Sequence, residues 1–307
     1  MNPEPRIVVL TGASGFIGSV VTERLLPRHA VRSLTSHPQK NRFGGRVQSV
    51  LYDFERPERM DPAFEGAETF VHSYYVRFPH AGETFERAVE RAGVLLDRAR
   101  RAGVRRIVHV SVSNADEASD LPYYRNKGRQ ERLVRESGLE FAILRPALVF
   151  GAGDILLNNI AWFLRRAPVF GVFGDGSCRV QPVAVDGFGA LIAEAVESPD
   201  TGTITDVAGP IDYTYLDMVR LIRAAVGSRA ALVRMPVSLA LAASWVTGFI
   251  VRDVILTRDE AKGLMQEYLY SPNPRRVGMS LQDWLRRDDV RQYLGRTYSS
   301  ELERHFR

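Results

Sequence analysis

The segment Ile7-Val-Val-Leu-Thr11-Gly-Ala-Ser-Gly-Phe-Ile-Gly18 decides the fold of this chain of 307 residues. It opens with a short apolar run, which is typical of a strand buried on both faces of a parallel sheet. Gly12, Gly15 and Gly18 follow at regular spacing, and a helical stretch then extends to about Leu26. A strand, a glycine-rich turn and a helix in this order predict a turn that holds a pyrophosphate.

The glycines matter because they permit a tight turn and let a phosphate approach the backbone closely. The free N–H groups and the positive dipole end of the following helix favour the anion. We therefore expect a dinucleotide cofactor to bind the following residues: Gly12, Ser14, Gly15, Phe16, Ile17 and Gly18.

Outward from this turn, strands and helices alternate through the first half of the chain. Further strands are predicted at 30–34, 47–52, 69–73, 106–111 and 141–144, with long helices at 83–101 and 123–137. This alternation predicts an α/β fold with a doubly wound parallel sheet, the Rossmann class, over residues 1–150. Residues 151–307 are predicted to form mostly a smaller, C-terminal substrate-binding lobe, with segments near 183–207 returning to the sheet.

The end of the second strand distinguishes the two nicotinamide cofactors. An acidic residue there would bind the ribose 2′-OH of NAD, whereas an arginine would suit the 2′-phosphate of NADP. Instead of an acid, the residues at and after this strand are Arg32, Ser36, His37, Lys40 and Arg42. NADP is therefore favoured over NAD. Asp53 ends the third strand, where its carboxylate either accepts a hydrogen bond from the adenine amino group or caps a turn.

Tyr123 and Lys127 are four residues apart on a predicted helix and therefore share one face. A tyrosine phenol has a pKa of about 10, and a neighbouring ammonium lowers it toward the range useful for acid–base catalysis. Lys127 is one of only three lysines among 41 basic residues, so a lysine at this position is a marked exception. Ser111 and Ser113 end the preceding strand, and Ser113 lies further toward the carboxyl end, where ligands bind in such sheets.

At these residues the chain resembles the short-chain dehydrogenase/reductase superfamily, in its extended and atypical branches of epimerase/dehydratase-like proteins. The matching motifs are Thr11-Gly-x-x-Gly-x-x-Gly18, Tyr123-x-x-x-Lys127, Leu144-Arg-Pro146 with Val149-Phe-Gly151, and Gln181-Pro-Val-Ala-Val-Asp186. The last two motifs are also similar to the group that includes the NADPH-binding accessory subunit of respiratory complex I. The resemblance covers the first two-thirds of the chain.

The resemblance implies an oxidoreductase that transfers a hydride between nicotinamide and a carbonyl or alcohol of a small organic substrate. In that role Ser113 polarises the substrate oxygen, Tyr123 exchanges its proton and Lys127 holds the ribose, while Pro146 flanks the nicotinamide. Substrate contacts are expected from Tyr74, Asn158 and Arg179.

Two other functions stay open. A dinucleotide-binding regulator or assembly protein without turnover is suggested by the short Ser113–Tyr123 spacing and by the bulky Tyr74 and Tyr75, where small residues usually stand. A nucleotide-sugar epimerase or dehydratase is the weaker alternative. His72 and His109 lie in predicted strands and are interpreted as core residues.

The composition excludes several classes of protein. A hydrophobic fraction of 45% and a charged fraction of 25% are ordinary for a globular protein. One cysteine, Cys178, suits a reducing compartment, so we expect a cytoplasmic protein. The scattered arginines argue against nucleic-acid binding, and no metal site is expected.

The apolar segment 237–251 is too short to span a membrane, so we expect no transmembrane segment. It predicts a buried helix or, alternatively, an interfacial or partner-binding one. The charged outer faces of helices 83–101 and 123–137 favour a monomer over a homodimer.

Overall fold

The computed structural model describes residues 5–254, 257–300 and 302–303. The chain forms two compact units. The first comprises Met1–Pro146 and Val185–Val207, and the second comprises Ala147–Ala184 and Ala208–Arg307.

The main sheet has the strand order β14-β11-β6-β5-β4-β1-β2-β3. The strands that build it in the first unit are β1 (Arg6–Thr11), β2 (His29–Thr35), β3 (Val47–Leu51), β4 (Ala67–His72), β5 (Arg106–Val110), β6 (Glu140–Pro146) and β11 (Thr203–Ala208). Their pairings with one another are all parallel. The predicted doubly wound parallel sheet is therefore confirmed. Directly after the two-residue β14 (Arg275–Arg276), Val277 N–H donates to the carbonyl of Ala208, which belongs to the same unit.

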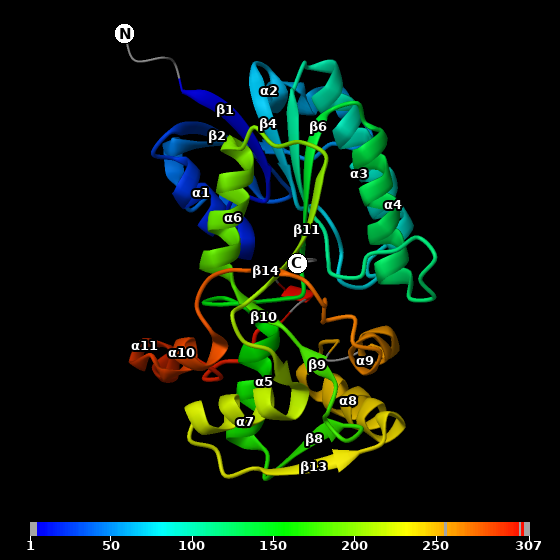
Figure 1. Cartoon of the computed structure of the whole chain (residues 1–307), viewed down its shortest axis with the longest axis vertical. Coiled ribbons are helices and arrows are strands. Elements are labelled where there is room, and N and C mark those ends of the chain that lie inside the picture. Colours follow the sequence, from blue (N-terminus) through cyan, green and yellow to red (C-terminus); the bar gives the residue numbers. More distant parts are fainter. Residues whose placement is uncertain (1–4, 255–256, 301, 304–307) are drawn as a thin grey trace. The chain divides into compact units, whose positions relative to one another are not determined.

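Helices cover both faces of this sheet in the first unit. These helices are α1 (Phe16–Leu25), α2 (Asp61–Phe64), α3 (Phe85–Arg101), α4 (Pro122–Glu136) and α6 (Val185–Glu197). Helix α1 packs on α6, and α3 packs on α4, so the two pairs form opposite layers (Figure 1). Short 3₁₀ turns lie between strands, namely η1 (Pro38–Lys40), η2 (Gly44–Arg46) and η3 (Pro57–Met60).

Burial of apolar residues explains why these elements form. Val8, Val9 and Leu10 of β1 are at most 1% exposed, as expected for a central strand covered on both faces. Helix α3 buries one apolar stripe, which comprises Phe85, Ala88, Ala92, Leu95, Leu96 and Ala99. Arg106 is also fully buried, and its guanidinium donates to the carbonyls of Ala195 and Asp200.

The second unit is built from helices and short strand pairs. Its helices are α5 (Ile155–Arg166), α7 (Tyr215–Ala225), α8 (Val237–Val251), α9 (Arg258–Met265), α10 (Leu281–Arg286) and α11 (Asp288–Tyr293). Its strand pairs are β7 (Leu148–Phe150) with β10 (Pro182–Ala184), β8 (Val169–Phe173) with β13 (Ala231–Met235), and β9 (Arg179–Val180) with β12 (Tyr213–Thr214). Their shared core includes an edge-to-face contact between Phe150 and Trp284.

Two segments were expected to return to the main sheet, and they behave differently. The segment 203–207 does so as β11, which pairs with β6. The segment 183–185 instead spans the end of β10, paired with β7, and the start of α6. Strand β10 is three residues long, and α6 begins immediately after it.

The apolar segment 237–251 is helical, as predicted, but its expected burial is wrong in part. Leu239 is 57% and Trp245 is 78% exposed on α8. Within the described ranges, no helix is long and apolar enough to cross a membrane.

Candidate functional site

The glycine turn connects β1 to α1 with a geometry that only glycine satisfies. Gly12 has a φ of +69° and donates its N–H to the carbonyl of Leu34 on β2. A Cβ at Gly18 would lie 2.0 Å from the carbonyl oxygen of Gly12. Gly15 is the N-cap of α1 and makes no side-chain capping bond, so the first-turn N–H groups of α1 can donate hydrogen bonds to an anion. The turn is therefore shaped for a phosphate group.

Hydrogen bonds fasten this turn to its neighbours. Thr11 Oγ1 accepts from the N–H of Ser73, and Ser73 Oγ donates to the carbonyl of Thr11, which joins the carboxyl ends of β1 and β4. Ser14 Oγ accepts from the N–H of Arg42, 3.3 Å away, so the segment after β2 folds beside the turn. The Arg42 guanidinium also contacts Glu23 on α1. A basic segment thus lies against the phosphate turn.

Arg32 lies within β2, whereas Ser36 follows it. Arg32 lies within the strand, and its guanidinium donates to the carbonyls of Pro62, Ala63 and Glu65 at the end of α2. Ser36 is exposed and follows the strand directly, ahead of the exposed Lys40 and Arg42 in the sequence. The Arg32 side chain therefore stabilises the C-terminal end of α2 in this structure.

Asp53 caps the turn after β3. Its Oδ1 accepts from the N–H of Arg56, 2.9 Å away, and the carboxylate pairs with Arg56 and Arg59. The hydrogen bond from the Arg56 N–H, with the two guanidinium groups, holds the pKa of Asp53 below its usual value.

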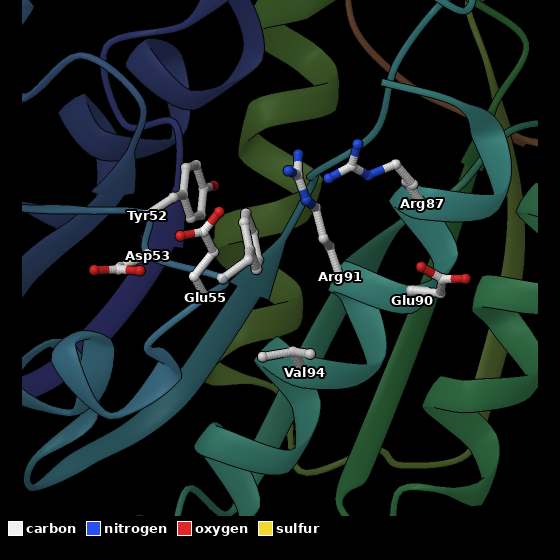
Figure 2. Close-up of a pocket in the computed structure, with 8 residues that line it drawn as sticks. Tyr52, Asp53, Glu55, Arg87, Glu90, Arg91 and Val94 are labelled. Atoms are coloured by element: carbon white, nitrogen blue, oxygen red, sulfur yellow. The ribbon is translucent and has the colours of Figure 1, made fainter. Parts of the chain in front are cut away.

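Asp53 also borders a hollow of about 420 Å³ between the end of β3 and helix α3, which we call the β3–α3 hollow. Its lining residues, drawn in Figure 2, are Tyr52, Asp53, Phe54, Glu55, Arg87, Glu90, Arg91 and Val94. The Arg91 guanidinium lies 4.6 Å from the centroid of the Phe54 ring. It also donates to Tyr74 Oη and pairs with Glu83. Tyr74, one of the expected substrate residues, is thus held beside this hollow.

Helix α4 presents Tyr123 and Lys127 one turn apart, as the spacing predicts. Lys127 is 3% exposed, and its Nζ donates to the carbonyl of Val110 at the end of β5 (3.1 Å). The same ammonium lies 4.3 Å from the centroid of the Tyr75 ring. Burial lowers the pKa of Lys127 to about 7, although Glu131 opposes the shift. Lys127 is therefore poised to change its charge near neutral pH.

The two candidate serines after β5 have different partners. Ser111 Oγ donates to the buried Glu131, whose carboxylate forms an ion pair with the partly exposed Arg145. Ser113 is fully buried, and its N–H donates to the carbonyl of Pro146 at the end of β6. The structure thus brings Ser113 and Pro146 together and commits Ser111 to a structural network.

Tyr75 has contacts that its sequence position does not predict. Its hydroxyl donates to the carbonyl of Tyr123, and its ring contacts both Tyr123 (5.3 Å between centroids) and Phe85 (5.8 Å). With Lys127 over its face, Tyr75 connects both members of the Tyr–Lys pair. The available signal was a bulky aromatic residue at a strand end where small residues usually stand.

His72 and His109 form a buried pair on adjacent strands. Their Nδ1 atoms are 2.8 Å apart, and both residues are fully buried. Burial lowers the pKa of His72 to about 3 and that of His109 well below its ordinary value, so both rings are neutral near pH 7. Their interpretation as core residues agrees with this placement.

The remaining expected substrate residues lie in the second unit. The Asn158 amide donates to the carbonyl of Thr297 and accepts from the N–H of Gly295. The Arg179 guanidinium pairs with Glu267 and lies 3.7 Å from the centroid of the Tyr270 ring. Both side chains thus hold chain segments in place here. Across the described residues, no group of three His, Cys, Asp or Glu side chains could hold a metal ion.

Known proteins are similar to this chain in sequence and in fold. Residues 12–151 match the family model described as NAD(P)H-binding. A ceramide reductase from Caulobacter vibrioides is 28% identical over 237 residues, which are 75% of this chain and 74% of that protein. The mitochondrial NADH-ubiquinone oxidoreductase 40 kDa subunit of Neurospora crassa is 22% identical over 273 residues, 86% of this chain and 72% of that protein.

Among solved structures, the NADPH-dependent quinone oxidoreductase QOR2 of Escherichia coli, complexed with NADPH, superposes with a TM-score of 0.74 at 17% identity. The superposition covers 91% of this chain and 98% of the quinone oxidoreductase chain. Other neighbours, at 20% identity or less, include nucleotide-sugar epimerases and a short-chain dehydrogenase/reductase, and these likenesses show the fold. Residues 12–151 of this chain thus match the NAD(P)H-binding family model, and the chain has the fold of the short-chain dehydrogenase/reductase and epimerase proteins.

Proposed function

We propose that the protein is an NADP(H)-preferring oxidoreductase that transfers a hydride between nicotinamide and a carbonyl or alcohol of a small organic substrate. The observation that carries this proposal is the buried Lys127 one helical turn after Tyr123, in the same unit as the glycine turn. Burying a lysine costs free energy, so a buried lysine beside a tyrosine is a candidate for acid–base chemistry. The reductase among the relatives supports the same class of reaction.

The residues present fit a dinucleotide. The turn excludes a Cβ at Gly18, so the start of α1 packs closely against the turn, as in a dinucleotide-binding fingerprint. The β3–α3 hollow beside Asp53 gives the adenine end a concave site next to aromatic side chains. Pro146 lies at the carboxyl end of β6, where it flanks the nicotinamide in this proposal.

The mechanism assigns one task to each side chain, and the bound cofactor supplies the hydride. Ser113 donates a hydrogen bond to the substrate carbonyl oxygen and polarises it. Tyr123 gives its phenolic proton to that oxygen as negative charge develops there. The Lys127 ammonium favours the resulting phenolate and binds the ribose hydroxyls. Tyr75 holds both α4 residues through its ring and hydroxyl.

Three observations support the preference for NADP. The residues after β2 include the exposed Ser36 and Lys40 rather than an acid. Arg42 lies beside the phosphate turn through its N–H bond to Ser14. Its guanidinium is exposed and pairs with Glu23 at the surface, where such a pair is worth little. Arg42 can therefore exchange this partner for a 2′-phosphate at small cost.

Substrate contacts from Tyr74, Asn158 and Arg179 remain part of the proposal, as does a cytoplasmic location. Tyr74 lies against Arg91, while Asn158 and Arg179 would have to exchange their present partners to reach a substrate. The single cysteine, Cys178, is free and buried, which suits a reducing compartment.

Thermal unfolding with NAD⁺, NADP⁺, NADH and NADPH tests the cofactor assignment, because binding raises stability with the logarithm of ligand concentration over Kd. We expect the largest rise in Tm with NADP⁺ or NADPH. A panel of carbonyl and quinone substrates is then screened for NADPH oxidation. Equal shifts with all four nucleotides would contradict the NADP preference, and no shift with any of them would contradict dinucleotide binding.

A second function is a dinucleotide-binding accessory or assembly protein without turnover. The 40 kDa subunit among the relatives and the packing of Lys127 against Tyr75 favour it. Nucleotide-induced stabilisation without turnover across the panel would select this function over the first. The epimerase alternative requires that a sugar nucleotide further raise the Tm of the cofactor-bound protein.

A further inference from the structure

Helix α8 presents an apolar face to solvent in the second unit. None of its 15 residues is charged, and its polar side chains are only Ser238, Ser244 and Thr247. Leu239, Ala242 and Trp245 are exposed and follow one another at intervals of three, so they share one face of the helix. We call these three residues the α8 face. Trp245, at 78% exposure, is far more exposed than a tryptophan that contributes to a core.

The charged side chains in the segment that contains this helix are asymmetric in sign, and one exposed acid from outside the segment, Asp175, lies near Arg234. Within the described part of 229–262, every exposed charged residue is basic, namely Arg229, Arg234, Arg252, Arg258 and Lys262. Arg234 precedes α8, and Arg252 follows it directly. Each acid of this stretch is at least half-buried. Asp253 is buried and accepts from Tyr298 Oη, and Glu260 is bound in the capping box of α9.

We propose that α8 is an interfacial helix that docks this protein on the surface of an anionic lipid bilayer. Tryptophan prefers the boundary between headgroups and acyl chains, where its ring is buried and its N–H stays hydrated. Exposed arginines at both ends of an apolar helix attract anionic headgroups. Fifteen helical residues span roughly 22 Å, less than the ~30 Å hydrocarbon core, so the helix lies on the bilayer rather than across it.

Charge complementarity favours a bilayer over a second copy of the chain. A two-fold interface would place the same basic rim of one copy against that of the other, and like charges would repel. The helix contains no charged residue, and its hydroxyl groups come only from serine and threonine. It therefore has few groups that could recognise a specific protein surface. An anionic membrane matches both features, the apolar face and the basic rim.

Vesicle sedimentation of the full-length protein tests this docking. We expect binding to vesicles of mixed phosphatidylglycerol and phosphatidylcholine, with much weaker binding to phosphatidylcholine alone and a loss of affinity as salt rises. Trp245→Ala should weaken binding roughly tenfold through lost apolar burial. The double variant Arg234→Gln/Arg252→Gln should weaken it on the order of 25-fold, at about fivefold per arginine.

Matched controls come from exposed residues of the first unit. Leu51→Ala on β3, where Leu51 is 52% exposed, and Arg135→Gln on α4 should leave vesicle binding unchanged. Trp245 fluorescence should shift to shorter wavelength on binding, and Trp245→Phe should remove that shift. All variants should keep the wild-type Tm, because each altered side chain is exposed.

Three results would overturn the proposal. The first is no binding to anionic vesicles, or equal binding to neutral ones. The second is binding without a change in Trp245 emission, which would assign the contact to another surface. The third is self-association of the wild type that is lost in Trp245→Ala and that vesicles do not change. That result would assign the α8 face to a second copy of the chain.

Discussion

At the residue scale, the environment of Lys127 shows how burial prepares a side chain for chemistry. Its ammonium is enclosed by the Val110 carbonyl and the Tyr75 ring, and burial lowers its pKa from 10.5 to about 7. The folded protein therefore binds this proton less tightly than the unfolded chain does. This effect destabilises the fold by its full amount below about pH 7, and the destabilisation disappears as the pH rises toward 10.5.

Lys127→Met should accordingly stabilise the fold by on the order of a few kcal/mol near pH 7, with a gain that shrinks toward pH 10. Urea unfolding as a function of pH measures this difference. Lys262→Met, at an exposed lysine of α9, is the control and should show no such dependence. If the gain in unfolding free energy for Lys127→Met did not change with pH, burial would not destabilise the charged form of Lys127 as inferred here.

Tyr75 is the second residue whose contacts allow a prediction. Tyr75→Phe removes the hydroxyl that donates to the Tyr123 carbonyl but keeps the ring between Phe85 and Lys127. We expect it to lose about 1 kcal/mol of unfolding free energy, whereas Tyr75→Ala should lose clearly more because a cavity forms. Equal losses in the two variants, measured by urea unfolding, would show that the ring packing contributes nothing.

At the element scale, the β1–turn–α1 segment was predictable because its chemistry is local. The glycine spacing and the apolar run before it lie within twelve residues, and the structure shows the same strand, turn and helix. The partners of Arg32 were not predictable, because the carbonyls that it binds belong to α2, about 30 residues later. The same holds for Asn158, whose partners lie at 295–299.

Gly18→Ala tests the turn as an element. The added Cβ would lie 2.0 Å from the Gly12 carbonyl oxygen, so the turn must deform, and we expect the nucleotide-induced rise in Tm to disappear. Gly45→Ala in η2 is the matched control, since a Cβ there meets no atom within 4 Å. A normal nucleotide shift in Gly18→Ala would place the pyrophosphate elsewhere.

Arg42→Ala tests the segment after β2. Because Arg42 is exposed and its ion pair with Glu23 lies at the surface, its loss should cost little stability. We expect the affinity for NADPH to fall about tenfold or more while that for NADH changes little, since only the former carries the 2′-phosphate. Titration by intrinsic fluorescence measures both affinities. An equal change in the affinities for NADPH and NADH would show that Arg42 does not bind the 2′-phosphate.

At the scale of the whole molecule, the sequence indicated the class of sheet but not the surroundings of α8. A helix that is apolar all round is typical of a buried position, and the pattern alone contains no sign that Leu239 and Trp245 face solvent. Tertiary packing decides burial, and it acts between residues far apart in the chain. The same reason explains why Tyr75, though noticed as bulky, was not recognised as the contact of Lys127.

The charged outer residues of α3 and α4 favour a monomer. Arg87 and Glu90 on α3, with Arg129 and Arg132 on α4, point to a hydrated surface rather than an apolar interface. Sedimentation velocity at moderate salt, without lipid, should therefore give the mass of one chain, about 34.4 kDa. A tight dimer abolished by substitutions on α3 and α4 would contradict this prediction.

The central claim is that Tyr123 transfers a proton while a bound nicotinamide transfers a hydride. The most direct test is steady-state NADPH oxidation by wild type and Tyr123→Phe with the best substrate of the carbonyl and quinone panel. We expect kcat of the variant to fall on the order of 10² to 10⁴-fold while the NADPH-induced rise in Tm is retained. Unchanged turnover in Tyr123→Phe, with the cofactor still bound, would contradict the account.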